Sequence, residues 1–145
     1  MNIYWMRRDL RLEDNPALQA AIKTGEELLI LFIFDPAILK KLPDDDRRVS
    51  LIYQRLSSLD LELAQHGSKI NICYDHPLKV WKTLIEELQP DRVYWNRDYE
   101  PHFRARDAEV YKFLESQDVE VNSFQDHLMI EPGQLLKADG HPYTI

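Results

Sequence analysis

Three arginines near the N-terminus are the first residues whose type and spacing suggest chemistry. They follow a short apolar run, residues 2–6, and are Arg7, Arg8 and Arg11. A guanidinium offers planar, paired donors that suit a phosphate or a carboxylate. Carboxylates stand in the same stretch, at Asp9, Glu13 and Asp14. Pairing within the stretch is therefore favoured over capture of a free anion, and the absence of glycine there excludes a glycine-rich dinucleotide turn.

Two carboxylates, Asp98 and Glu100, follow a second short run, the aromatic residues 92–95. Paired carboxylates can act as general acid and base, but no nucleophile or histidine accompanies these two at a recognisable spacing. Orienting the polar groups of a ligand, or pairing with arginines, is the favoured role. The sequence thus predicts no catalytic residue, and its single cysteine and scattered histidines predict no metal site.

Alternating strands and helices must position these loops. Apolar runs without alternation predict strands that are covered on both sides, at residues 2–6, 28–34, 69–74, 92–95 and 119–124. Between them, apolar residues at helical spacing predict helices from Pro16 to Gly25, from Val49 to Gly67, from Pro77 to Leu88 and from about Phe103 to Ser116. Asp14 or Asn15 is expected to cap the first helix. Residues 36–48 are expected to form a solvated loop.

This order of elements predicts an α/β fold. Strands joined by long helical crossovers pair in parallel and cross over right-handedly, so we expect a doubly wound, Rossmann-like sheet of five strands in the order 3-2-1-4-5. The first and fourth strands are then neighbours, and the loop with Arg7 and Arg8 faces the loop with Asp98 and Glu100. Ligands of such sheets bind in the crevice at this point.

Three further residues have a packing interpretation. Trp5 and Trp95 fall within expected strands, so we expect them in the core and not against a ligand. Arg106 begins a helix in the run Arg104-Ala105-Arg106-Asp107, where a salt-bridged surface is expected.

Composition limits the class of protein. A chain of 145 residues with 44% hydrophobic residues fits one globular domain. Its net charge of −7 argues against a protein whose main surface follows a phosphate backbone. The sequence has no leader-like segment and no run of about 20 apolar residues, so we expect a cytoplasmic protein without a membrane span.

Three separated motifs resemble the DNA photolyase and cryptochrome family. They are residues 5–15 (WMRRDLRLEDN), residues 94–101 (YWNRDYEP) with 104–107 (RARD), and residues 126–133 (DHLMIEPG) with 140–144 (GHPYT). The resemblance spans the chain and keeps the motifs in order. It implies an N-terminal α/β domain at residues 1–130 and, at residues 131–145, the start of a connector to a helical domain that lies outside this sequence.

The resemblance also implies which domain of a full-length parent binds each cofactor and the DNA. The helical domain would hold the FAD, the flipped pyrimidine dimer and most DNA contacts, so the present fragment alone is expected to lack repair activity. The α/β domain of many members carries an antenna chromophore that passes excitation to the FAD. On this resemblance we expect the antenna domain of a deoxyribodipyrimidine photolyase that repairs cyclobutane dimers. A cryptochrome photoreceptor, or a structural module without a chromophore, remains the alternative.

The antenna itself is also suggested by the resemblance. Members that bind folate carry Asn-Glu directly before the Arg-Ala-Arg-Asp run, where this chain has His102-Phe103, so folate is not favoured. The Asp98-x-Glu100-Pro101 arrangement is similar to that of members with a deazaflavin or FMN. Carried over position by position, the chromophore-binding residues would be Arg8, Asp98 and Glu100, with Ile33, Phe34 and Asp35 nearby.

Overall fold

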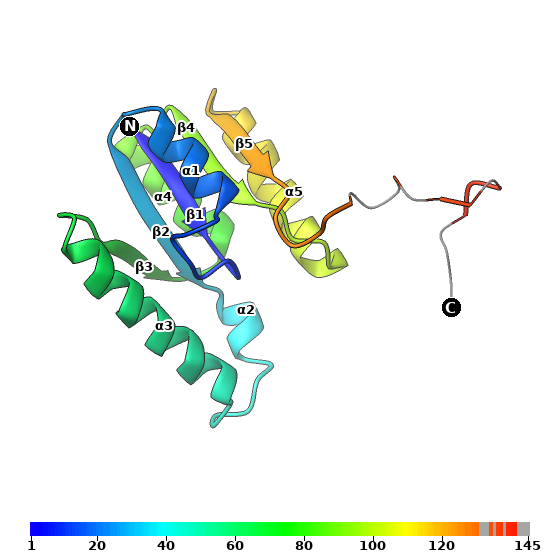
Figure 1. Cartoon of the computed structure of the whole chain (residues 1–145), viewed down its shortest axis with the longest axis horizontal. Helices are drawn as coiled ribbons and strands as arrows, with labels where there is room; N and C mark the ends of the chain where they lie inside the picture. Colours follow the sequence, from blue (N-terminus) through cyan, green and yellow to red (C-terminus); the bar gives the residue numbers. More distant parts are fainter. Residues whose placement is uncertain (131–133, 135, 138, 142–145) are drawn as a thin grey trace.

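The computed structural model describes residues 1–130, 134, 136–137 and 139–141. Its centre is a five-stranded sheet in the order β3-β2-β1-β4-β5, with every neighbouring pair parallel (Figure 1). The strands are β1 (Asn2–Met6), β2 (Leu28–Phe34), β3 (Ile70–Tyr74), β4 (Arg92–Asn96) and β5 (Glu120–Phe124). The predicted fold class and strand order are therefore confirmed. Most of the predicted connector, residues 131–145, falls outside the described residues.

Five helices lie between the strands in the described chain: α1 (Pro16–Lys23), α2 (Pro36–Leu39), α3 (Arg47–Ala64), α4 (Pro77–Leu88) and α5 (Pro101–Glu115). Asn15 caps α1, since its side chain accepts a hydrogen bond from the Leu18 N–H at 3.1 Å. Gly25 follows the end of α1 with a φ of 70°, a conformation that glycine adopts without strain. No helix among the described residues combines the length and the apolar content that a membrane crossing requires.

The segment after β2 differs from the expectation of a loop, because it begins with α2. Asp35 caps this short helix by accepting a hydrogen bond from the Ala37 N–H at 2.8 Å. Pro36 occupies the first helical position, where a missing N–H leaves no bond unmade. A cap followed by proline is a recognisable start signal, so the sequence did contain the evidence for this turn of helix.

The apolar core has two layers, one on each face of the sheet, and each layer is covered by two helices. One core cluster joins the sheet to α1 and α3, and the other joins it to α4 and α5. Figure 1 shows α1 in front of β1 and α4 behind it. Successive residues of a strand point to opposite faces, so Phe34 packs with the α1 and α3 layer and Ile33 with the α4 and α5 layer. These two predicted ligand residues therefore face different sides of the sheet.

Candidate functional site

A buried hydrogen-bonded cluster, the Asp9 cluster, lies where the carboxyl ends of β1 and β4 meet on the α1 side. It consists of Tyr4, Asp9, Asn15 and Asn96, of which every residue is at most 4% exposed. The Asp9 carboxylate accepts hydrogen bonds from the Tyr4 hydroxyl at 2.6 Å, from the Arg7 N–H at 2.8 Å and from the Asn96 amide. The buried carboxylate is thus surrounded by donors, as a stable buried charge must be.

The two asparagines of this cluster tie separate elements together. The Asn15 amide donates to the Tyr4 hydroxyl at 2.7 Å, and the Asn96 amide donates to the Asn15 oxygen at 2.9 Å. The Asn96 oxygen in turn accepts from the Ala17 N–H in the first turn of α1, at 3.2 Å. Burial, together with the Asp9 charge, raises the pKa of the Tyr4 hydroxyl above its ordinary range. The sequence does not predict this buried role of Asn96, because nothing local marks an amide whose partners are distant in sequence.

A second cluster, the arginine cluster, occupies the other face of the sheet at the same end. Arg7 Nη1 lies 2.5 Å from Asp107 Oδ2 and 3.7 Å from Asp98 Oδ2. Arg106 Nη2 lies 3.0 Å from Asp98 Oδ2 and 2.7 Å from Asp107 Oδ1. The side chains of Arg7 and Asp98 are 4% and 2% exposed. Two guanidinium groups therefore neutralise two carboxylates by cross-pairing, in a place from which water is largely excluded.

Two buried tryptophan rings pack against the arginine cluster. Trp5 and Trp95 are 1% and 2% exposed and pack edge to face, with their ring centroids 5.7 Å apart, so their predicted core role is confirmed. The guanidinium carbons of Arg7 and Arg106 lie 5.1 Å and 5.0 Å from the centroid of Trp5. Cations at this distance from an indole face are attracted by it.

The predicted salt bridges of Arg106 are present, but the expectation that they lie on the surface is wrong. Its side chain is only 12% exposed and points toward Trp5, Asp98 and Asp107. Arg106 stands one helical turn before the buried Val110 of α5, so the helix carries it to the inward side. The four-residue spacing between Arg106 and Val110 was the sequence signal for an inward-facing position. It was not used because a charged residue is usually expected at the surface.

The outer rim of the site is an exposed ion pair between Arg8 and Glu100. The two side chains are in direct contact and are 52% and 51% exposed. The hydrogen bond from Arg8 holds the pKa of the Glu100 carboxyl below its usual range. Arg11 turns elsewhere, to the Asp126 carboxylate at 3.0 Å and to the Asp14 carbonyl oxygen at 2.7 Å. The predicted facing of the β1 and β4 loops is therefore present. The predicted pairing of the three arginines within their own stretch is wrong, because their carboxylate partners come from distant elements that the fold brings to this edge.

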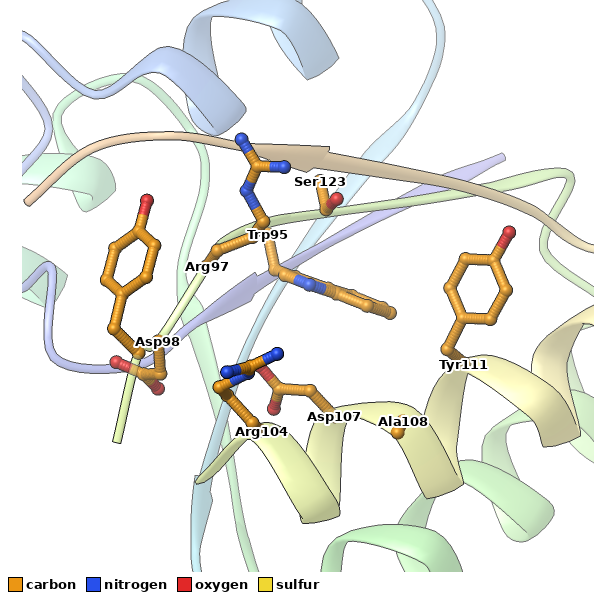
Figure 2. Close-up of a pocket in the computed structure, with 9 residues that line it drawn as sticks. Trp95, Arg97, Asp98, Arg104, Asp107, Ala108, Tyr111 and Ser123 are labelled. Atoms are coloured by element: carbon orange, nitrogen blue, oxygen red, sulfur yellow. The ribbon is translucent and has the colours of Figure 1, made fainter. Parts of the chain in front are cut away.

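Two hollows flank α5, one on each side of the arginine cluster. The first, here called the β2 hollow, has a volume of about 500 Å³ and is lined by Asp35, Ala37, His76, His102, Ala105, Arg106, Ala108, Glu109 and Lys112. The second, here called the β5 hollow, has a volume of about 490 Å³ and is lined by Trp95, Arg97, Asp98, Tyr99, Arg104, Asp107, Ala108, Tyr111 and Ser123 (Figure 2). Both volumes lie in the range of small-molecule sites.

The predicted ligand residues lie at the same edge of the sheet, but they belong to different hollows or to the rim. Asp35 lines the β2 hollow, whereas Asp98 lines the β5 hollow. Arg106 connects them, because it lines the β2 hollow and pairs with Asp98. Arg8 and Glu100 form the rim. Since these carboxylates and guanidinium groups are already paired or capping, the arrangement suits holding a polar ligand better than proton transfer.

Known proteins are similar to this chain along almost its whole length. A family model described as DNA photolyase matches residues 2–145. A deoxyribodipyrimidine photo-lyase of Synechococcus is 35% identical over 143 residues, which cover 99% of this chain and 30% of that protein. Cryptochrome-2 of Gallus gallus is 30% identical over 140 residues, which cover 97% of this chain and 24% of that protein.

Solved structures show the same likeness in three dimensions. A bacterial class III photolyase from Agrobacterium tumefaciens superimposes with a TM-score of 0.86 at 28% identity, over 99% of this chain and 29% of that one. An archaeal photolyase from Sulfolobus tokodaii, described as containing two FAD molecules with the implication of a novel light-harvesting cofactor, gives a TM-score of 0.77 at 27% identity, over 94% of this chain and 32% of that one. The present chain thus spans about a third or less of each of these relatives.

Proposed function

Because this chain belongs to the DNA photolyase family, we propose that it is the light-harvesting domain of a deoxyribodipyrimidine photolyase. The observation that carries the proposal is the meeting of the β1 and β4 loops, with Arg8 against Glu100 and the buried Asp98 behind them. Ligands of doubly wound sheets bind at this switch point. The Sulfolobus relative supports a light-harvesting role, since its description implies such a cofactor.

Catalysis would take place in a full-length parent and not in this 145-residue chain alone. The parent would use light and reduced FAD, held in a C-terminal helical domain, to split cyclobutane pyrimidine dimers in DNA. The α/β domain would contact that helical domain and touch DNA little, in line with its net charge of −7. Light-dependent dimer repair by the 145-residue chain alone would contradict this division.

The residues present fit a flavin-type antenna such as a deazaflavin or FMN. Such a ring has a donor and acceptor edge, and the site offers both kinds of partner. Asp35 and Arg106 line the β2 hollow, whose volume of about 500 Å³ is sufficient for a small ligand. Ile33 contributes an apolar side chain on the same face. When bound, the antenna would absorb light and pass its excitation to the FAD.

We propose that such a ligand enters past the exposed Arg8–Glu100 pair. An exposed ion pair contributes between about 0 and 1 kcal/mol, so opening Arg8 from Glu100 is easy, and both groups then become free for the polar edge of the chromophore. Asp98 is harder to release, because Arg7 and Arg106 both hold it. We therefore assign direct contact to Arg8, Glu100 and Asp35, and to Asp98 the positioning of Arg106. Phe34 supports the strand end from the other face.

Titration with FMN and with a deazaflavin tests the antenna proposal. Saturable binding of at least one is expected. Glu100→Gln should weaken it roughly fivefold to tenfold, the effect of losing one charge-assisted hydrogen bond to the ligand. Asp98→Asn should weaken it by a similar factor through the loss of the ion pair that positions Arg106. Glu13→Gln is the matched control, since Glu13 is exposed and lies outside both hollows. If neither compound binds to this chain or to the full-length parent, the antenna proposal fails.

A cryptochrome photoreceptor is the second candidate, favoured by the 30% identity to the avian cryptochrome. Assaying dimer repair by the full-length parent separates the two, since repair supports the photolyase. A structural α/β module is the third candidate, favoured by the complete cross-pairing of the arginine cluster. Absence of chromophore binding, with full stability retained in Glu100→Gln, would favour that module.

A further inference from the structure

The β5 hollow lies on the side of α5 that the proposed antenna does not use. It is formed between α5 and the edge strand β5, and its volume is about 490 Å³. Figure 2 shows Arg104, Asp107 and Tyr111 along α5 on one side, Arg97 and Ser123 on the other, and the Trp95 ring between them. Trp95 is 2% exposed, so it closes the floor. Tyr111 is 42% exposed and offers the hollow a ring face.

Two carboxylates line the hollow, but both are paired with cations of the arginine cluster. Arg7 and Arg106 form ion pairs with both Asp98 and Asp107, so these carboxylates are neutralised. Arg104 is exposed, and among the described residues its side chain has no ion pair or hydrogen bond. Its guanidinium is therefore available to an incoming anion.

Tyr99, one of the residues that line the hollow, has a hydroxyl without a partner in the described part of the chain. The Tyr99 hydroxyl oxygen is buried and makes no hydrogen bond among the described residues. A buried polar atom without a partner is destabilising, and a bound ligand with an acceptor would satisfy it. Ser123 adds a second hydroxyl to the lining. The hollow therefore combines hydrogen-bond donors, an available cation and an aromatic face.

We propose that the β5 hollow binds a planar heteroaromatic anion of the size of a nucleoside monophosphate. The ring would pack against Tyr111, the anionic group would pair with Arg104, and an acceptor would receive the Tyr99 hydroxyl. This site is separate from the proposed antenna site, because α5 stands between the two hollows. It holds whether or not a chromophore binds at the β2 hollow.

Calorimetric titration of the 145-residue chain with adenosine 5′-monophosphate tests this assignment. One saturable site is expected, with adenosine and inorganic phosphate each binding at least about tenfold more weakly, because each lacks one half of the recognised ligand. Phosphate binding as tight as the nucleotide would overturn the aromatic part of the assignment. Adenosine binding as tight as the nucleotide would overturn the role of Arg104.

Variants locate the binding on the correct side of α5. Arg104→Gln should weaken nucleotide binding about tenfold and Tyr99→Phe about fivefold. Lys112→Gln is the matched control, since Lys112 is an exposed cation of α5 that lines the other hollow, and it should leave binding unchanged. Circular dichroism checks that each variant is folded. Equal losses in Arg104→Gln and Lys112→Gln, or no saturable binding to the unaltered chain, would overturn the proposal.

Discussion

The Asp9 cluster and the arginine cluster occupy the same end of the sheet on opposite faces, and they bury charge in different ways. Asp9 is a single carboxylate surrounded by hydroxyl, amide and backbone donors, and its cluster joins β1, β4 and the start of α1. The arginine cluster pairs two cations with two carboxylates, and its members line hollows on both sides of α5. We call the Asp9 cluster closed because it only joins elements of the fold, and the arginine cluster open because its members border the two hollows in which we propose that ligands bind.

Removing the carboxylate of the closed cluster should have the largest effect on stability. Asp9→Ala leaves the Tyr4 hydroxyl, the Arg7 N–H and the Asn96 amide without their acceptor in a buried place. We expect the free energy of unfolding to fall by about 4 kcal/mol, since each unmade buried hydrogen bond costs about 1–3 kcal/mol. Urea unfolding measures this, with the exposed Glu13→Ala as control. A loss below about 1 kcal/mol would show that the cluster is not needed for the fold.

Breaking the open cluster should cost somewhat less. Arg7→Met removes the partner of Asp107, but Arg106 still contacts that carboxylate. We expect a loss of about 3 kcal/mol, at the low end for a broken buried pair. Arg7→Met leaves one cation, Arg106, for two carboxylates. The double variant Arg7→Met/Asp107→Leu should be more stable than Arg7→Met alone, because it restores one cation to one carboxylate. Equal or additive losses in the unfolding experiment would contradict pairing as the cause.

Tyr4 makes the closed cluster sensitive to alkaline pH. Its pKa is raised in the folded chain by burial and by Asp9, so the folded state holds its proton where the unfolded state releases it. The stabilisation is complete below the unfolded value of about 10 and is lost as the pH rises above it, by at most about 1.4 kcal/mol per pH unit. Tyr4→Phe should lower stability by about 1 kcal/mol at pH 7.

The measurement for Tyr4 is the free energy of unfolding between pH 8 and 11. The alkaline decline should be shallower in Tyr4→Phe than in the unaltered chain, because one titrating group has been removed. Identical declines in the two proteins would show that Tyr4 does not control the alkaline response.

The rim pair should matter least to the fold. Arg8 and Glu100 are both about half exposed, so solvent screens their attraction, and Arg8→Gln should change stability by less than about 0.5 kcal/mol. The pKa of Glu100 is lowered in the folded chain, so the small contribution is present above the unfolded value of about 4.3 and is lost as the pH falls below it. Thermal unfolding at pH 3 and pH 7 measures it. If Arg8→Gln lowered the free energy of unfolding as much as Arg7→Met does, the Arg8–Glu100 pair would be necessary for the fold.

Much of the architecture could be predicted because its signals are local. Continuous apolar runs identified the strands, Asn15 with Pro16 marked the start of α1, and parallel pairing led to the strand order and to the meeting of the β1 and β4 loops. The facing of Arg8 and Glu100 followed from that order alone. The α2 turn after Asp35 was missed, although its cap and proline were visible in the sequence.

The sequence by itself determined the order of elements, the sheet topology and the edge at which polar side chains gather, because these depend on periodicity and chain connection. Only the tertiary structure decided which carboxylate each arginine takes. Arg7 pairs with Asp107, a residue 100 positions away, and Arg106 turns inward to Asp98. Such choices depend on how α5 packs against β1 and β4, and several acidic partners are equally plausible until that packing brings one within reach.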